Sequence, residues 1–186
     1  QTCALPIYAP LANGGFRVKP IAMTDLGKGI PKGDLATPKR TRVFSDGVAY
    51  EVTRILRDNV QGGTGTNANI GIAEAGKTGT TSDYVDAWFV GYTPRYVCAV
   101  WVGYPNSDGT RREMTGVHGI TVAGGTFPAQ IWGDFMRTVT AKDGNVDWPL
   151  PKDPVDWSAF SSDFTRSAGS YVVSSAKSTS TGKTTS

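Results

Sequence analysis

The feature that most constrains the fold is a pair of apolar runs in the middle of the chain, separated by three turn-forming residues. Residues 87–92 (AWFVGY) and 96–104 (YVCAVWVGY) are rich in aromatic and β-branched side chains, and Thr93-Pro94-Arg95 lies between them. Two such runs around a short turn predict an antiparallel β-hairpin. Because their apolar content is nearly continuous, we expect both strands to be central in a sheet and covered on both faces.

Three elements are predicted before this hairpin. YAPLANGG, residues 8–15, is expected to end a helix, since glycine after the last turn supplies a left-handed cap. FRVKPIAM, residues 16–23, alternates apolar and polar residues and predicts a strand that its proline keeps near a sheet edge. A second helix, capped by Ser45 or Asp46, is predicted to stop at Gly62-Gly63. Its predicted apolar face is formed by Val48, Val52, Ile55, Leu56 and Val60.

One helix is predicted after the hairpin. Pro128 is a favourable first helical residue and follows Thr126 or Phe127. The face that this helix is expected to bury on the sheet carries Ile131, Phe135, Met136 and Val139.

The ends of the chain differ in character from its centre. We expect residues 8–140 to form the folded part, residues 141–165 an extended surface linker, and residues 166–186 a disordered Ser/Thr-rich tail. Residues 1–7 (QTCALPI) have neither an initiator Met nor the pattern of a signal peptide. They resemble a translated sequencing-adapter remnant, and we expect them to be a non-native segment.

Composition argues against several kinds of site. The net charge is +3, and no dense Lys/Arg run with interleaved aromatics favours nucleic acid. Cys3 and Cys98 are too few for a disulfide framework or a metal cluster, and Cys98 is expected to be a buried small hydrophobe. His118 is the only histidine and is expected at the surface. No apolar run approaches the roughly 20 residues of a membrane span.

The stretch Gly71–Thr81 (GIAEAGKTGTT) fits two incompatible motifs. It matches the phosphate-binding pattern G-x-x-x-x-G-K-[ST], and it also contains the K-T-G element of penicillin-recognising serine enzymes. A phosphate-binding loop requires a helix that begins at the Lys-Thr pair. Thr78 and Gly79 are poor first residues for a helix, and strand-like residues follow them. We therefore interpret the stretch as K-T-G, and keep nucleotide binding as a remote alternative that a magnesium-dependent ATP titration would test.

A strand at this position would arrange its side chains for chemistry. Lys77 and Gly79 would share one face and Thr78 and Thr80 the other. Lys77 would place an ammonium near a nucleophile, and Gly79 would let a substrate backbone lie against the strand. The two threonine hydroxyls would be offered to a substrate carboxylate. The backbone N–H of Thr80 would serve as one donor of an oxyanion hole, which is worth about 3–4 kcal/mol per donor.

Longer segments strengthen this interpretation. AGKTGTTSDYVDAWFVGYTP (75–94) and GGTFPAQIWGDFM (124–136) closely resemble the C-terminal part of the transpeptidase domain of class A penicillin-binding proteins. YAPLANGGFRVKP (8–20) and DNVQGGTGTNANIGIAEAGKTGT (58–80) fit the same family. The resemblance implies an α+β fold of the α/β/α type, in which an antiparallel sheet is flanked by helices and its N-terminal part is missing here.

The resemblance also implies an activity and a set of site residues. Such enzymes are peptidoglycan D,D-transpeptidases: a serine in S-x-x-K attacks the D-Ala-D-Ala end of a stem peptide, and β-lactams trap that serine. The implied catalytic residues are Lys77 and Thr80, and the implied substrate-binding residues are Thr78, Gly79, Thr80 and Thr81. No metal or other cofactor is expected. The implied parent protein is bacterial, extracytoplasmic and membrane-associated, anchored through a segment outside this chain.

One departure from the family pattern limits what this chain alone is expected to do. The S-x-x-K and S-x-N elements of the family precede K-T-G, but Ser45 is the only serine before Lys77 and satisfies neither pattern. The two S-x-x-K matches, at Ser174 and Ser180, lie in the tail and are interpreted as chance. We expect the nucleophile to lie outside this chain and the isolated chain to be inactive. A non-catalytic sensor that binds penicillin or cell-wall peptide is the alternative.

Overall fold

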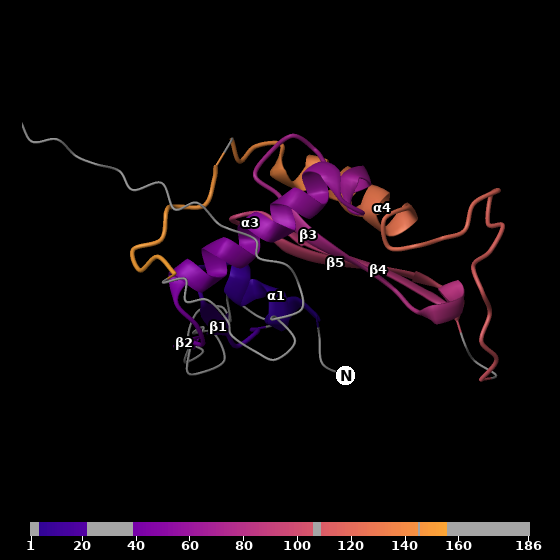
Figure 1. Ribbon diagram of the computed structural model, residues 1–186, viewed down its shortest axis with the longest axis horizontal. Coiled ribbons are helices and arrows are strands. Elements are labelled where there is room, and N and C mark those ends of the chain that lie inside the picture. Colours follow the sequence, from indigo (N-terminus) through magenta and orange to yellow (C-terminus); the bar gives the residue numbers. More distant parts are fainter. Residues whose placement is uncertain (1–3, 22–38, 106–108, 145, 156–186) are drawn as a thin grey trace, which may run out of the picture. The chain divides into compact units, whose positions relative to one another are not determined.

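The computed structural model describes residues 4–21, 39–105, 109–144 and 146–155 (Figure 1). These residues belong to one structural unit, Gln1–Val155. The tail expected at residues 166–186, together with part of the expected linker, lies outside the described residues. The elements, in chain order, are α1 (Ala4–Ala12), β1 (Phe16–Val18), β2 (Arg40–Arg42), α3 (Asp46–Gly62), the 3-10 helix η1 (Thr66–Ala68), β3 (Ala75–Thr80), the 3-10 helix η2 (Ser82–Tyr84), β4 (Asp86–Tyr92), β5 (Val97–Gly103) and α4 (Phe127–Thr140).

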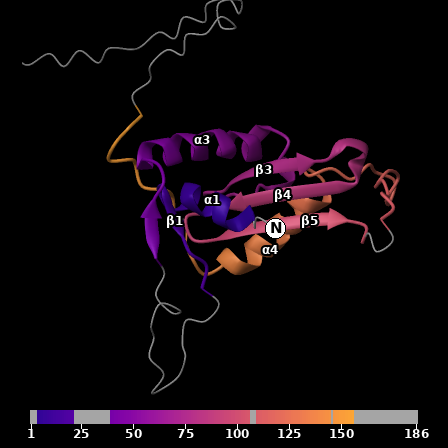
Figure 2. The same cartoon turned by 90° about the horizontal axis from the view of Figure 1, so that it is seen from below.

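A three-stranded antiparallel sheet in the order β3-β4-β5 is the centre of the unit. The predicted hairpin is confirmed as β4 and β5, in a register that places Trp88 opposite Trp101. Its turn is closed by Thr93, whose backbone N–H donates to the carbonyl of Tyr96 at 2.9 Å. Helices α1 and α4 lie on opposite sides of the sheet and α3 runs beside β3, as Figure 2 shows. Helices around an antiparallel sheet are the expected α+β class.

One face of the sheet packs against α4 through a core in which no residue is solvent-exposed. Phe89 of β4 meets Trp132 of α4 edge to face, with ring centroids 5.4 Å apart. Trp132 also donates its indole N–H to the carbonyl of Cys98 at 3.2 Å. The half-buried Cys98 packs against this cluster, and burial raises the pKa of its thiol. The other members of the core are Val60, Ala68, Ala129 and Met136.

The buried face of α4 differs from the predicted one. Met136 is buried as expected, but Ile131 and Phe135 are 47% and 53% exposed. The helix is rotated so that Gly133 lies against η1, where a Cβ would lie 3.2 Å from the carbonyl oxygen of Asn67. Close approach at Gly133 and the large side chain of Trp132 therefore decide which face is buried, and the residues buried are Pro128, Ala129, Trp132, Gly133 and Met136.

Helices α1 and α3 meet the other side of the sheet at Tyr92. Its hydroxyl lies 3.0 Å from Thr53 Oγ1 of α3, and its ring is 6.4 Å from that of Tyr8 in α1. The cap predicted for α3 is confirmed, because Ser45 Oγ accepts from the N–H of Val48 at 3.2 Å. Its predicted apolar face is only partly buried: Val60 is buried, whereas Val48 and Ile55 are 40% and 62% exposed.

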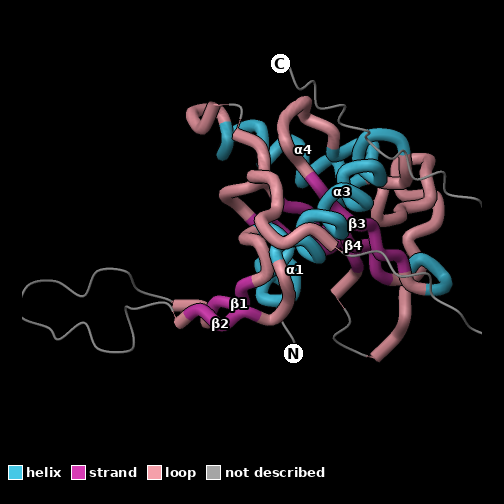
Figure 3. The backbone as a smooth tube through the Cα atoms, turned by 60° about the vertical axis from the view of Figure 1, so that its left-hand side comes forward, coloured by secondary structure: helices cyan, strands magenta, loops and turns pink. Residues whose placement is uncertain are grey.

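Two strand expectations also need correction. Of the strand expected over 16–23, residues 16–18 form β1, residues 19–21 are not strand, and residues 22 and 23 lie outside the described residues. Strand β1 pairs with β2 in a separate two-stranded ribbon visible in Figure 3. The expectation that both hairpin strands are central holds for β4 but not for β5, which is the last strand in the described order β3-β4-β5. The expected cover on both faces likewise holds for most of β4 but is wrong for β5, where Trp101 is 45% exposed. Within the part of the chain that the structure describes, no helix has the length and apolarity to cross a bilayer.

Candidate active site

The Lys-Thr-Gly element lies in the middle of β3, an edge strand of the sheet. Lys77 is opposite Val90 and Gly79 is opposite Trp88 in antiparallel register. The strand continues through Thr80, so Lys77 does not begin a helix. A phosphate-binding loop needs its lysine at a helix N-terminus, and the nucleotide-binding alternative is therefore wrong for this residue.

The edge of β3 that faces away from β4 presents backbone groups of Thr78 and Thr80. The N–H of Thr81 donates to the carbonyl of Asp86 at 3.0 Å, which marks these two residues as a hydrogen-bonded pair. Hydrogen-bonded pairs alternate along an antiparallel ladder. The main-chain groups of Lys77 and Gly79 therefore face β4, and those of Thr78 and Thr80 face the other edge.

Helix α3 holds the start of this strand through Asn59. The side-chain amide of Asn59 donates to the carbonyl of Gly76 at 2.8 Å, and its Oδ1 accepts from the N–H and hydroxyl of Thr64 at 3.1 and 3.0 Å. Gly63 and Gly65 allow the chain to turn closely around this side chain, since a Cβ at either would lie within 3 Å of Asn59. Asn59 thus ties the residue before Lys77 to the end of α3.

Lys77 is exposed, and its ammonium donates to the carbonyl of Thr78 at 2.9 Å. Because side chains alternate along a strand, it shares a face with Gly79 and, across the ladder, with Val90 and Trp88. The ammonium therefore lies beside the free edge of β3, on the face that carries the two exposed tryptophans Trp88 and Trp101.

The threonine hydroxyls of the candidate site are engaged on the other side of the strand or at its end. Thr78 Oγ1 lies 2.8 Å from Thr64 Oγ1, and Thr80 Oγ1 accepts from the N–H of Gly124 at 3.0 Å. Thr81 Oγ1 accepts from the N–H of Asp86 at 2.8 Å. A hydroxyl has one hydrogen, so Thr80 keeps its own to donate. Thr81 Oγ1 already donates to the carbonyl of Asp86 at 3.4 Å, and Thr78 Oγ1 donates to Thr64 Oγ1, because the Thr64 hydrogen is given to Asn59 Oδ1. The predicted site residues are therefore adjacent along one strand and its end, with their hydroxyls fixed by neighbours.

The loop before α4 packs directly on the strand at Gly79. A Cβ added to Gly124 would lie 2.3 Å from the carbonyl oxygen of Trp88 and 2.7 Å from that of Gly79. Gly124, Asn59 and Thr64 were not predicted from the sequence as site residues. The only signal in the sequence is the clustering of glycines next to polar residues, in QGGTGTN and AGGT, which indicates close backbone approaches.

The family of the chain follows from comparison with known proteins. The family described as "Penicillin binding protein transpeptidase domain" matches residues 4–121. Penicillin-binding protein 1A of Aquifex aeolicus is 34% identical over 158 residues, which cover 80% of this chain and 20% of that protein. The protein of the same name from Neisseria lactamica is 33% identical over 138 residues, covering 70% of this chain and 16% of that protein. The chain thus spans a fifth or less of the length of these relatives.

Solved structures agree with this assignment. PonA1 of Mycobacterium tuberculosis superposes with a TM-score of 0.64 at 26% identity, covering 84% of this chain and 44% of that one. A second structure, of PonA1 in complex with penicillin V, gives a TM-score of 0.61 at 26% identity and covers 81% of this chain and 40% of that one. With its K-T-G element on an antiparallel edge strand, the chain belongs to the penicillin-binding protein transpeptidase domain family, and its relatives are of the class A type.

Proposed function

We propose that this chain forms the Lys-Thr-Gly wall of the acylation cleft of a peptidoglycan D,D-transpeptidase. In that reaction a serine is acylated by the D-Ala-D-Ala end of a stem peptide, and the acyl group passes to an amine on a neighbouring strand. The observation that carries the proposal is the free edge of β3, where the backbone of Thr78 and Thr80 is presented beside the ammonium of Lys77.

Each candidate residue has a role that follows from its position. A peptide that lies along β3 would pair with the backbone of Thr78 and Thr80, as strand addition to a free edge requires. The N–H of Thr80 would donate to the oxyanion of the tetrahedral intermediate. Lys77 would stabilise negative charge at the serine and at the substrate carboxylate. The hydroxyl of Thr80 would donate to that carboxylate, and the hydroxyls of Thr78 and Thr81 would do so on exchanging their bonds to Thr64 and to the Asp86 carbonyl. Gly79 would leave room for the peptide backbone.

The nucleophile of the proposed reaction is not supplied by this chain. Ser45 is the only serine before Lys77, and it has a structural role, since its hydroxyl caps α3. We propose that an S-x-x-K serine outside these residues completes the site in a bacterial, extracytoplasmic and membrane-associated protein. If the parent gene encodes no such serine, the same β3 edge would fit a penicillin- or peptide-binding sensor without turnover.

Covalent labelling with fluorescent penicillin tests the proposal. We expect the 186-residue chain to remain unlabelled, and a longer product of the same gene that contains an S-x-x-K serine to be labelled. In that longer protein, Lys77→Ala should slow labelling about 100-fold or more, as expected for loss of a group that assists the chemical step. Lys142→Ala, an exposed lysine beyond α4, is the matched control. A penicillin adduct on the 186-residue chain would contradict the proposed location of the nucleophile.

A further inference from the structure

A cleft of about 720 Å³ opens at the end of the sheet where β3 leads into η2. Its walls come from four parts of the chain: the end of β3, the segment from η2 to the start of β4, the last residues of β5, and the loop that follows β5. Its lining includes the side chains of Thr80, Thr81, Trp101, Tyr104, Arg111 and Arg112. Thr80 and Thr81 also belong to the candidate active site, so the cleft is continuous with the β3 edge.

The wall from β5 is a fixed, exposed aromatic surface. Trp101 is 45% exposed, and its indole N–H donates to Asp86 Oδ1 at 2.8 Å. Its ring also lies 6.4 Å from that of Trp88, its cross-strand partner, which is 39% exposed. A large apolar ring held in one orientation at the surface offers contact area to a ligand with little loss of side-chain entropy.

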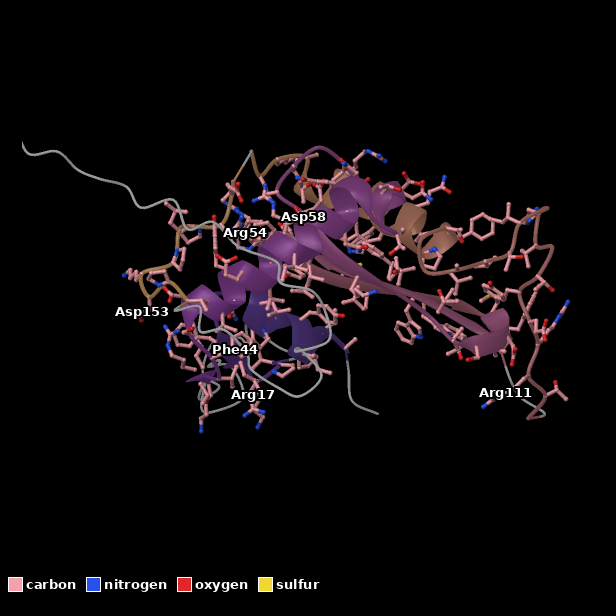
Figure 4. The ribbon with its side chains drawn as sticks, viewed as in Figure 1. Arg17, Phe44, Arg54, Asp58, Arg111 and Asp153 are labelled. Atoms are coloured by element: carbon pink, nitrogen blue, oxygen red, sulfur yellow. The ribbon has the colours of Figure 1, made fainter. Side chains whose placement is uncertain are left out.

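The wall from the loop is basic. The guanidinium of Arg112 lies 4.0 Å from the centre of the Tyr104 ring, which holds it in place by a cation–π contact. Arg111 is its neighbour and projects near the same end of the sheet (Figure 4). Asp86 is the carboxylate among the lining residues, and one of its oxygens is bonded to Trp101. Two guanidinium groups against one engaged carboxylate favour an anionic ligand, and guanidinium geometry suits a carboxylate.

We propose that this cleft binds a carboxylate-bearing residue of the same peptide whose end lies along β3. The inference rests on the proposed function, because it takes the β3 edge as the place where the peptide terminus binds. An extended chain advances about 3.3 Å per residue, so a peptide that follows the edge past Thr80 enters the cleft within one or two residues. Trp101 then covers its aliphatic part, and Arg111 and Arg112 bind its carboxylate. The cleft selects acidic stem peptides over neutral ones.

NMR titration of the 186-residue chain with two short peptides tests this. Both peptides end in D-Ala-D-Ala; one carries a side-chain carboxylate two residues before that pair, and the other carries its amide. The backbone amides of Thr78 and Thr80 report on the β3 edge, and the indole N–H of Trp101 reports on the cleft. We expect the acidic peptide to shift both sets of signals and to bind about two- to fivefold more tightly than the amide for each arginine engaged. The preference should weaken as salt is raised.

Three variants test whether Arg111 and Arg112 cause the preference for the acidic peptide. In Arg111→Gln and Arg112→Gln the preference for the acidic peptide should shrink towards equal affinity, whereas Arg54→Gln, an exposed arginine on α3 (Figure 4), should keep it. Equal affinity of wild type for both peptides, or movement of the Thr80 amide without movement of the Trp101 indole, would overturn the cleft proposal and leave the proposed function intact. Movement of the indole alone would contradict the β3 edge and retain an acidic-peptide site. No movement at either place would overturn both.

Discussion

Asn59 of α3 donates its side-chain amide to the carbonyl of Gly76, the residue immediately before Lys77. Asn59 approaches β3 from the edge that does not pair with β4, which is the edge where substrate is proposed to bind. The Gly76 carbonyl that it engages is the last backbone acceptor on this edge before the candidate site. The same side chain accepts two bonds from Thr64, whose hydroxyl in turn contacts Thr78. The position of the Lys-Thr-Gly strand therefore depends on one amide in a helix.

Asn59→Ala should destabilise the chain by about 2 kcal/mol, because several hydrogen bonds worth about 1 kcal/mol each are lost and the carbonyl of Gly76 loses a partner. Urea unfolding measures the change in free energy. Asn69→Ala is the matched control, since this exposed asparagine accepts one bond, from the N–H of Gly71 at 3.1 Å. If both variants lost the same stability, Asn59 would have no special role in holding β3.

How much of this site is predictable from the sequence depends on the range of the interactions. The hairpin and the K-T-G strand were predicted correctly because their patterns are local: alternation, a short turn, and residues unsuited to start a helix. The position of Asn59 at the strand was not, because nothing near it in the sequence specifies Gly76 as its partner. Glycine doublets indicate that some close approach occurs, but which segments approach is decided by tertiary packing.

The buried face of α4 was predicted incorrectly for a similar reason. The apolar residues at 131, 135, 136 and 139 form a stripe at helical spacing. A pattern based on apolar side chains does not account for a glycine, which packs closely through its backbone. In the structure Trp132 packs on the sheet and Gly133 packs on η1, while Ile131 and Phe135 are exposed. A stripe that includes a glycine and a tryptophan can bury more contact than one made of aliphatic residues, because the backbone of the helix comes closer to its neighbour.

Gly124→Ala should be destabilising because the loop before α4 has no room for a side chain. The new Cβ would meet the carbonyl oxygens of Trp88 and Gly79 at 2.3 and 2.7 Å, so the loop must move away from β3. Overpacking of this kind costs about 1–3 kcal/mol, and displacement would also break the bond from Gly124 to Thr80 Oγ1.

Thermal or urea unfolding measures the loss, and the amide shift of Thr80 reports the displacement. Gly62→Ala serves as the control, because a Cβ there meets nothing within 4 Å and alanine is the better helix former. It should leave stability unchanged or slightly raised. A Gly124→Ala chain as stable as wild type would show that the loop adapts without leaving the strand.

Glu74, directly before β3, should make stability fall as pH rises above the ordinary range of a carboxyl group. The side chain is 4% exposed, and its carboxylate accepts from the N–H groups of Ile72 and Ile70 at 2.9 and 3.4 Å. Burial raises its pKa above the ordinary 4.5, although those backbone bonds and Arg57 oppose the shift. The folded chain therefore holds this proton more tightly than the unfolded chain, and stability is lost as pH rises from 4.5 through the raised pKa.

Glu74→Gln removes the titration. The difference in unfolding free energy between wild type and Glu74→Gln should change with pH in that window, with wild type losing stability relative to the variant as pH rises. Taking the difference cancels the contribution of Asp46, whose pKa is lowered mainly by hydrogen bonds from the backbone of Lys152 and Asp153 and which therefore acts in the opposite direction. A difference that stays constant with pH would show that Glu74 does not titrate differently on folding.

Tyr92 should set an alkaline limit to stability. Its side chain is fully buried, and burial raises the pKa of its hydroxyl from 10.0 to about 12, against the opposing effect of the bond to Thr53. Because the unfolded chain ionises this group first, the stability that the neutral hydroxyl provides is complete below pH 10 and is lost as pH rises towards 12. The loss at pH 12 should be about 2 kcal/mol.

Tyr92→Phe should cost about 1 kcal/mol of stability at neutral pH through the lost hydrogen bond. Its unfolding free energy should nevertheless decline less steeply than that of wild type between pH 10 and 12. Part of the decline should remain, because burial also raises the pKa of Tyr8 in contact with it. The control is Tyr96→Phe, at an exposed position in the hairpin turn, which should keep the full decline. Urea unfolding at each pH measures the unfolding free energy. If it fell equally steeply with pH in Tyr92→Phe and in wild type, Tyr92 would not be the source of the decline.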